Sequence, residues 1–463
     1  MSELPDGIPR ARPAEPRDSA AAILVRRDED GRDRVLLARR SRSTRFMPGH
    51  LSFPGGTIDA ADRETADPFR AAASRELDEE LGLQVEATEW IDAGDRITPP
   101  MFPVRFMNRF FVHRVEALRD EIAPMTDELD SARFELAETV LEAWERGECR
   151  VPPPVLPILR CLARHESASL EQLAEAIRQA NQREERTPRI EFTPGTWMVP
   201  LSTATLPPAT HTNVWFPGGR FFAIVDPGSD EPEELDRLAG VIERRCSDGD
   251  RLRMVLLTHH HQDHVDGVAQ IATRLDVPVC AHEATLEPLR DRLGDLRTLT
   301  IADGETIDLA GITLRAHHTP GHAVGHMAFE LVDRGLLLTG DLVSSVSTIL
   351  IDPESGDMGD YLQSLERMKE LGCKTLLPGH GTPLPGKTLE RVLEHRRQRE
   401  SKIRVQLGDA PLELDRIARQ AYDDLPEMPL PLIRRQTLSH LLLLERSGSA
   451  RRVGEDGDQW STQ

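Results

Sequence analysis

A histidine-rich run from Thr258 to His264 constrains this chain more than any other feature. Written as HxHxDH, it places His259, His261, Asp263 and His264 within six residues. The apolar run Met254–Leu257 just before it predicts a buried strand, so the histidines are expected on the loop that leaves this strand, where functional residues concentrate. Imidazole and carboxylate groups are preferred ligands of zinc and similar divalent ions. The alternatives are a solvated loop or a purification tag, but a tag would be terminal and would lack the interleaved aspartate.

Three later segments each supply one more candidate ligand. They are His322 in Thr319–His322, Asp341 at the end of Leu336–Asp341, and His380 in Leu376–Gly381. Each candidate lies on a glycine-containing turn after strand-like residues, and glycine permits the tight backbone that aims a side chain into a shared site. The four segments together predict one metal centre.

The order HxHxDH, H, D, H over about residues 190–385 resembles the metallo-β-lactamase fold superfamily, which implies an αββα sandwich. The resemblance implies two Zn²⁺ ions, or Mn²⁺ or Fe²⁺ in their place. One ion would take His259, His261 and His322, the second would take Asp263, His264 and His380, and Asp341 would bridge them. Two ions a few ångströms apart can generate a hydroxide at neutral pH and polarise the bond under attack, and a carboxylate has two oxygens with which to bridge. Asp263 is also a catalytic candidate, because it could orient hydroxide if one metal alone binds.

Two neighbouring histidines are not expected to bind metal. If the loop has the family shape, His260 points away from the ligands, into solvent or behind them. For His326, a contact to a ligand, a contact to substrate and a structural hydrogen bond all remain open.

A second candidate site lies far upstream, on a predicted acidic helix. Asp67 and Pro68 predict its N-terminus, and Gly82 predicts its end. Glu76, Glu79 and Glu80 then fall at positions i, i+3 and i+4, on one face of the helix. Clustered carboxylates repel one another unless a cation offsets the repulsion, and oxygen ligands suit Mg²⁺ or Mn²⁺, which in turn bind a diphosphate. The alternative is a solvated acidic helix face.

Residues 75–83 match REUxEExGU, the helical half of a Nudix box, and Leu51–Asp59 resembles its FPGG-containing start. This part of the chain resembles Nudix hydrolases, in particular the coenzyme A diphosphatase branch. The resemblance implies an α/β/α sandwich in which Glu76, Glu79 and Glu80 bind metal and Glu79 and Glu80 are catalytic. The stretch from Gly56 to Arg75 is longer than in the standard box.

Composition agrees with a multidomain α/β enzyme. At 463 residues the chain is too long for one ordinary core. It has no apolar run long enough to span a membrane, and Met1–Arg17 lacks the apolar region of a secretory signal. Its five cysteines form no CxxC pair, so a reducing cytoplasm fits best. Its basic residues are almost all arginine, which is typical of a GC-rich bacterial genome.

A formal net charge of −21 argues against broad binding to nucleic acids or anionic membranes. It leaves room for a local basic groove. The run Glu394–Glu400 is the best candidate for such a groove, and a solvated helix face is the alternative.

We expect three regions: a Nudix domain over 1–185, a metallo-β-lactamase-fold domain over 186–386, and a winged-helix-like helical region over 387–463. The first boundary is placed in the polar stretch Asn181–Arg189, after helices expected over Phe134–Gly147 and Ser169–Gln179. The tail resembles that of lactamase-like hydrolases related to single-strand endoribonucleases and to glyoxalase II.

The combined expectation is a bifunctional metal-dependent hydrolase. The second domain would hydrolyse an ester, thioester or phosphodiester with metal-bound hydroxide. The first would cleave a nucleoside-diphosphate-linked small molecule, such as coenzyme A or its thioesters. The rival hypothesis is a ribonuclease whose Nudix domain processes or senses nucleotides. The sequence does not name either substrate or the oligomeric state.

Overall fold

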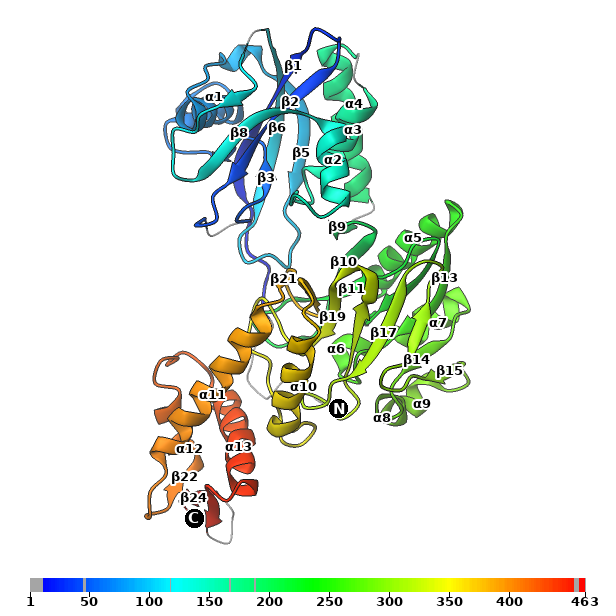
Figure 1. The fold of residues 1–463 in the computed structure, drawn as a ribbon, viewed down its shortest axis with the longest axis vertical. Coiled ribbons are helices and arrows are strands. Elements are labelled where there is room, and N and C mark those ends of the chain that lie inside the picture. The colour runs from blue at the N-terminus through cyan, green and yellow to red at the C-terminus, as the bar shows by residue number, and fades with distance from the viewer. Residues whose placement is uncertain are drawn as a thin grey trace. The chain divides into compact units, whose positions relative to one another are not determined.

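The computed structural model describes residues 11–44, 47–116, 118–165, 168–186, 189–453 and 458–462. Most of the N-terminal stretch, residues 1–10, therefore lies outside the described residues. Contacts divide the chain into two compact units, residues 13–197 and residues 198–463. Both mix helices with sheets, as predicted (Figure 1). No helix in the described ranges combines the length and apolar character that crossing a membrane requires.

The first unit has an eight-stranded sheet between helices (Figure 1). Its main order is β5-β6-β1-β2-β8-β7, with β3 paired to β2 and β4 paired to β1. The strands are β1 Arg17–Arg27, β2 Asp33–Arg40, β3 Leu51–Ser52, β4 Gly55–Thr57, β5 Ile91–Ile97, β6 Phe106–Val115, β7 Glu121–Ile122 and β8 Leu129–Leu136. The helices are α1 Pro68–Leu81, α2 Ala137–Glu145, α3 Leu156–Arg164 and α4 Leu170–Arg186.

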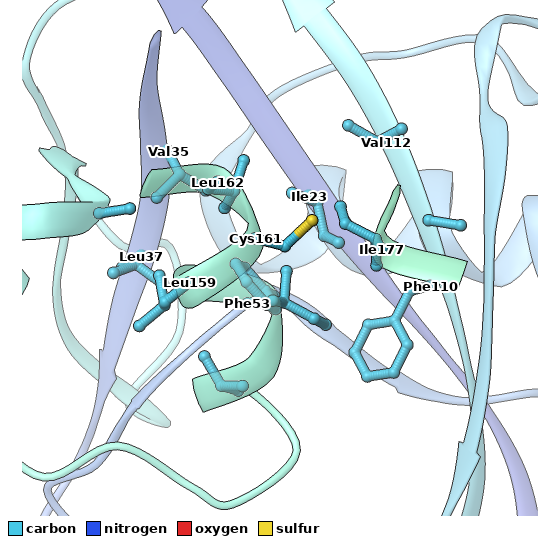
Figure 2. Close-up of a cluster of buried hydrophobic side chains, with 14 of the residues drawn as sticks. Ile23, Val35, Leu37, Phe53, Phe110, Val112, Leu159, Cys161, Leu162 and Ile177 are labelled. Carbon is cyan, nitrogen blue, oxygen red and sulfur yellow. The ribbon is translucent and has the colours of Figure 1, made fainter. Parts of the chain in front are cut away.

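Strand β1 explains the two layers of this unit, because successive side chains on a strand point to opposite faces. Ala20, Ala22 and Leu24 pack in the core that contains α1. The intervening residues Ala21, Ile23 and Val25 pack in the core that contains α2, α3 and α4 (Figure 2). A strand covered on both faces is apolar throughout rather than alternating.

The predicted caps of α1 are confirmed. The Asp67 side chain accepts hydrogen bonds from the backbone amides of Phe69 and Arg70, and Gly82 ends the helix at φ +65°. The glutamates of the predicted acidic face are therefore on a helix with well-defined ends.

Two other helix predictions were wrong at their boundaries. Residues 134–136 belong to β8, where Phe134 pairs with Leu36 of β2, and α2 begins only at Ala137. The polar residues 181–186 continue α4 instead of forming a linker. A polar run at the end of an amphipathic helix has the composition of a linker, so composition alone does not separate the two. The division into 1–185, 186–386 and 387–463 stays a prediction.

The chain from β9 onward has two larger sheets. The seven-stranded sheet has the order β15-β14-β13-β12-β11-β10-β9, and the six-stranded sheet has the order β16-β17-β18-β19-β20-β21. The strands of the first are β9 Ile190–Thr193, β10 Thr196–Ser202, β11 His211–Phe216, β12 Phe221–Val225, β13 Arg251–Leu256, β14 Val279–Ala281 and β15 Thr298–Thr300. Those of the second are β16 Thr306–Asp308, β17 Thr313–His318, β18 Met327–Leu331, β19 Leu336–Gly340, β20 Thr375–Pro378 and β21 Leu384–Pro385.

Helices cover these sheets. Helices α5 and α7 contact β13 of the first sheet, and α10 shares a core with β19 and β20 of the second. The helices are α5 Pro232–Ser247, α6 Gln262–Val265, α7 Val268–Leu275, α8 Glu283–Leu286, α9 Arg290–Leu293 and α10 Met358–Glu370. The arrangement is the predicted sandwich of two sheets with outer helices.

The end of the chain adds three helices and a small sheet with the order β22-β24-β23 (Figure 1). These elements are α11 Thr388–Gln406, α12 Leu414–Ala421, α13 Leu430–Arg446, β22 Leu412–Glu413, β23 Arg451–Val453 and β24 Gln459–Ser461. They share a core around Ile403, Leu441 and Trp460. Three helices and a three-stranded sheet are the elements expected of a winged-helix-like tail.

Candidate active sites

The seven predicted ligands of the second unit come together from separate loops. Each loop follows the end of a strand: β13 leads to His259–His264, β17 to His322, β19 to Asp341 and β20 to His380. Their ligand atoms form three groups within 4.8 Å: His259, His261 and His322; His259, His264 and Asp341; and Asp263, His264 and His380. The first and third groups have the composition of the two predicted metal sites.

Four of the histidines have their Nδ1 atoms committed to hydrogen bonds. His259 Nδ1–H donates to the Thr258 hydroxyl at 2.9 Å, and His264 Nδ1–H donates to the Asp226 carboxylate at 2.9 Å. His322 and His380 donate to the carbonyls of Leu350 at 2.8 Å and of His211 at 2.9 Å. This leaves each Nε2 as a lone pair, which is the form that binds a metal.

The Nε2 atoms and carboxylates of the candidate ligands point at one another, and this arrangement suits the binding of a cation. The Nε2 atoms of His264 and His380 lie 3.2 Å apart, close enough to share one proton or to bind one metal ion. Within the described part of the chain, Nε2 of His259, Nε2 of His322 and Oδ1 of Asp341 are buried and have no hydrogen-bond partner. Buried polar atoms normally have partners, and a divalent ion in each group would satisfy them. The donor set therefore fits the implied metal pair.

The two carboxylate oxygens of Asp341 face different groups of candidate ligands. Its Oδ1 lies 3.5 Å from His264 Nε2 and 3.3 Å from His380 Nε2, while Oδ2 lies 3.6 Å from His322 Nε2. Burial would raise the pKa of Asp341, but His380 and His264 outweigh it and hold the pKa well below its usual value. The residue is thus a buried anion that faces both sides, as the bridging role requires.

The histidines of the two groups differ in their pKa. Burial lowers the pKa of His259, His261 and His322; neighbouring imidazoles lower it further for His259 and His261, whereas Asp341 and the Leu350 carbonyl oppose the shift for His322. Burial also acts on His264 and His380, but there Asp341 and Asp263 outweigh it and raise the pKa. The carboxylates thus make the second group attractive to positive charge, whether a proton or a metal ion.

Asp226 is a contributor that the sequence analysis missed. It lies after β12 and is only 2% exposed, and it accepts hydrogen bonds from the Thr258 amide and hydroxyl as well as from His264. It thereby ties the start of the histidine loop to one of the ligands. The available signal was its position directly after the apolar run Phe222–Val225, the same pattern that identified Asp341.

The sequence left three roles open for His326: a contact to a ligand, a contact to substrate or a structural hydrogen bond. The hydrogen bonds of its ring favour the structural role. Its Nδ1–H donates to the Thr319 hydroxyl at 2.8 Å, and its Nε2 accepts from the Asp341 backbone amide at 3.1 Å. Burial is the main cause that lowers the pKa of His326 to about 3, so the ring is neutral and holds the Asp341 backbone. His260 belongs to none of the three groups of candidate ligands.

In the first unit, the three glutamates of α1 differ in their solvent exposure. Glu80 is 6% exposed and accepts a hydrogen bond from the Gly55 amide, whereas Glu79 is exposed. Burial raises the pKa of Glu80 to about 7 and also raises that of Glu76. A cation near both carboxylates would offset this cost of burial. The three glutamates do not form a cluster as tight as the three histidine groups among the described residues.

Arg75, which the sequence analysis did not assign a role, organises this acidic surface. It contacts Asp62, Glu76 and Glu79 and donates to the Thr57 carbonyl at 2.9 Å. Gly56 lies so close to Glu76 that an added Cβ would be 2.2 Å from its carboxylate. A side chain at position 56 would therefore displace the Glu76 carboxylate from its present position.

The basic run Glu394–Glu400 is helical; Glu394, Arg397 and Gln398 form an exposed face, whereas two of its arginines are buried. Arg396 is 1% exposed and donates to the Ile349 carbonyl, and Arg399 is 4% exposed and pairs with Asp424. Arg397 is exposed and pairs with Glu366. Two of the three arginines thus face the interior, because their guanidinium groups bind backbone carbonyls there.

Comparison with known families identifies both units. Residues 16–150 match the family model of the NUDIX domain, and residues 207–380 match that of the metallo-beta-lactamase superfamily. The chain contains a NUDIX domain and a metallo-beta-lactamase domain. Both are hydrolase families, in agreement with the predicted hydrolase fusion.

Relatives of the metallo-beta-lactamase domain include lactamase-like proteins. Lactamase-like protein nscB of Aspergillus fumigatus is 34% identical over 196 residues, which cover 42% of this chain and 55% of that protein. Beta-lactamase-like protein 2 homolog of Drosophila melanogaster is 27% identical over 270 residues, 54% of this chain and 86% of that protein. The match thus spans little more than half the length of the fungal relative.

A solved structure supports the fold. The beta-lactamase domain protein from Burkholderia ambifaria has a TM-score of 0.52 at 22% identity, with 59% of this chain and 93% of that chain covered. At this identity the similarity speaks for the fold of the metallo-beta-lactamase domain alone.

Proposed function

We propose that the protein is a bifunctional metal-dependent hydrolase with one independent site in each domain. The observation that carries the proposal is the pair of facing Nε2 atoms of His264 and His380 beside the divided carboxylate of Asp341. In this proposal His259, His261 and His322 would hold one divalent ion, Asp263, His264 and His380 would hold the other, and Asp341 would serve both. Two such ions, Zn²⁺ or alternatively Mn²⁺ or Fe²⁺, supply a nucleophile at neutral pH and polarise the bond under attack.

The residues of this chain then have distinct tasks. Asp226, Thr258 and the carbonyls of His211 and Leu350 hold the imidazoles with Nε2 directed inward. Asp263, 3.4 Å from His380, would hold the second ion, and it is the candidate to orient hydroxide if one metal alone binds. Ester or thioester hydrolysis is the reaction we assign to this domain, with phosphodiester hydrolysis as the rival.

For the NUDIX domain we propose cleavage of a nucleoside diphosphate linked to another group, such as coenzyme A or its thioesters. Glu76, Glu79 and Glu80 would hold Mg²⁺ or Mn²⁺, which binds the diphosphate. Support comes from the buried Glu80 and the half-buried Glu76, because burial raises the pKa of both carboxyl groups and a cation would offset this cost. Glu79 and Glu80 are the candidate catalytic residues.

The test is a substrate screen of the purified protein with Mg²⁺ and, separately, with Zn²⁺ or Mn²⁺. The substrates are an acyl-coenzyme A, lactoylglutathione, nucleotide sugars and single-stranded RNA. We expect thioester hydrolysis with the transition metal and diphosphate cleavage with Mg²⁺. RNA cleavage with a higher kcat/KM that is lost in His261→Ala would replace the thioester assignment with a ribonuclease.

A further inference from the structure

The segment Ile349–Asp352 lies beyond the Asp341 loop and belongs to no helix or strand. Buried backbone groups outside regular structure need other partners, and here helices α11 and α13 supply them. Arg396 of α11 donates to the Ile349 carbonyl. From α13, Gln436 Oε1 accepts from the Ile351 amide at 3.0 Å and Ser439 donates to the Ile351 carbonyl.

Leu350 lies between these two anchored residues, and its carbonyl is the acceptor for His322 Nδ1–H at 2.8 Å. Ile349 and Ile351 are also packed in one core with Leu393 of α11 and with Leu443 of α13. The position of the Leu350 carbonyl therefore depends on hydrogen bonds from the two helices, in addition to packing in the core of the sandwich.

We propose that α11 and α13 are part of the metal centre, and that Gln436 is a positioning residue for His322. The inference rests on the proposed function, because it takes His322 to hold a metal ion. By fixing the Ile351 amide, Gln436 holds the Leu350 carbonyl, which in turn keeps the proton of His322 on Nδ1 and directs Nε2 inward. Such outer contacts commonly change metal affinity by about 10- to 100-fold.

Gln436 is the best of the three anchors to test. Arg396 also lies over the Tyr361 ring at 5.1 Å, and Ser439 also donates to the Arg435 carbonyl. Among the described residues, the hydrogen bond of Gln436 is to the Ile351 amide, and its Nε2 has no partner. Gln436→Met removes the acceptor at similar volume, whereas Gln436→Glu retains an acceptor oxygen.

The experiment is a Co²⁺ titration of the metal-depleted full-length protein, followed by visible absorbance. Gln398→Met on the exposed face of α11 is the matched control, and His322→Ala is the reference for loss of the ligand. We expect Gln436→Met to bind one of two Co²⁺ ions about tenfold more weakly and the other normally. Gln436→Glu should recover most of the affinity, and Gln398→Met should bind as the wild type does.

A second readout does not depend on metal. In ¹⁵N spectra of the metal-depleted protein, His322 should carry its proton on Nδ1 in the wild type and populate both tautomers in Gln436→Met. If the wild type binds two ions and Gln436→Met matches it, or weakens both ions equally, the positioning role is wrong and the proposed function stands. If the wild type binds no Co²⁺ at the histidine cluster, the proposed function fails, and this inference fails with it.

Discussion

At the residue scale, Asp341 is the position where the two candidate metal groups meet. Its two oxygens face different histidines at 3.3–3.6 Å. We expect Asp341→Ala to reduce bound transition metal from about two ions per chain and to lower turnover by more than about 100-fold, because even outer contacts of a ligand cost 10- to 100-fold. Metal analysis of protein purified without chelator, together with kcat, measures both effects. Full activity in Asp341→Ala would remove the bridging assignment.

Glu80 predicts a pH dependence of stability in the NUDIX domain. Burial raises its pKa from 4.5 to about 7, so between these values the folded state keeps a proton that the unfolded state has released. The free energy of unfolding therefore decreases as pH rises from about 4.5 to about 7, by up to about 3 kcal/mol. Added Mg²⁺ should reduce this loss, because it stabilises the charged carboxylate.

Calorimetric unfolding in chelator from pH 4.5 to pH 8 measures this dependence. Glu80→Gln should flatten it, whereas Glu79→Gln on the exposed side of the same helix should leave it in place. Two results would contradict the assignment of Glu80 as a buried carboxyl group that a cation stabilises in its charged form. One is a wild-type free energy of unfolding that does not change with pH in chelator. The other is a pH dependence that Glu80→Gln does not alter.

The identities of the candidate ligands were predictable, but their supports were not. Spacing and residue type single out His259, His322 and Asp341, since few side chains bind metal. The acceptors that orient His322 and His380 are backbone carbonyls of Leu350 and His211. Every residue has such a carbonyl, so no residue type marks them, and only the fold brings them to the site.

At the element scale, the loop after β12 packs directly against the ligand loop after β13. An added Cβ at Gly228 would lie 1.8 Å from the Asp263 backbone carbonyl, whereas a Cβ at Gly219 before β12 would meet nothing within 4 Å. We expect Gly228→Ala to displace Asp263 and His264 and to lower metal occupancy at least about tenfold. Gly219→Ala is the matched control and should keep wild-type occupancy.

Metal analysis and the melting temperature of the metal-depleted proteins distinguish the outcomes. Normal occupancy in Gly228→Ala would mean that the backbone around Asp263 can shift without affecting the metal centre. The close approach of Gly228 to the Asp263 backbone would then contribute to packing and not to metal binding.

The prediction of helices and strands succeeded where local sequence signals agree with one another. It failed where tertiary contacts determine the secondary structure. The apolar run before His259 is β13, and the capping residues of α1 are as expected. The segment 134–136 has helix-forming neighbours but pairs with β2, which overrides local preference. Similarly, the run around Arg396 is helical as predicted, yet the direction in which its arginines point depends on the carbonyls that α11 meets.

At the scale of the whole molecule, the two candidate sites lie in different compact units, and their ligands suit metal ions of different chemical hardness. Oxygen ligands on α1 suit Mg²⁺, and the histidine-rich groups suit zinc-like ions. Contacts within residues 13–197 and within residues 198–463 define the units separately. Each set of ligands comes from one unit, so neither site needs residues of the other to be complete.

The two activities should therefore separate. Glu79→Gln with Glu80→Gln should abolish Mg²⁺-dependent diphosphate cleavage and leave hydrolysis by the metallo-beta-lactamase domain within about twofold of wild type, since mutations at sites without shared partners act additively. His261→Ala should have the reverse effect, because His261 belongs to the group with His259 and His322. The measurement is kcat/KM of each full-length variant on one substrate per domain, with circular dichroism to verify folding. Loss of both activities in either folded variant would contradict independent sites and favour a regulatory coupling, in which the NUDIX domain binds a nucleotide to control the hydrolase.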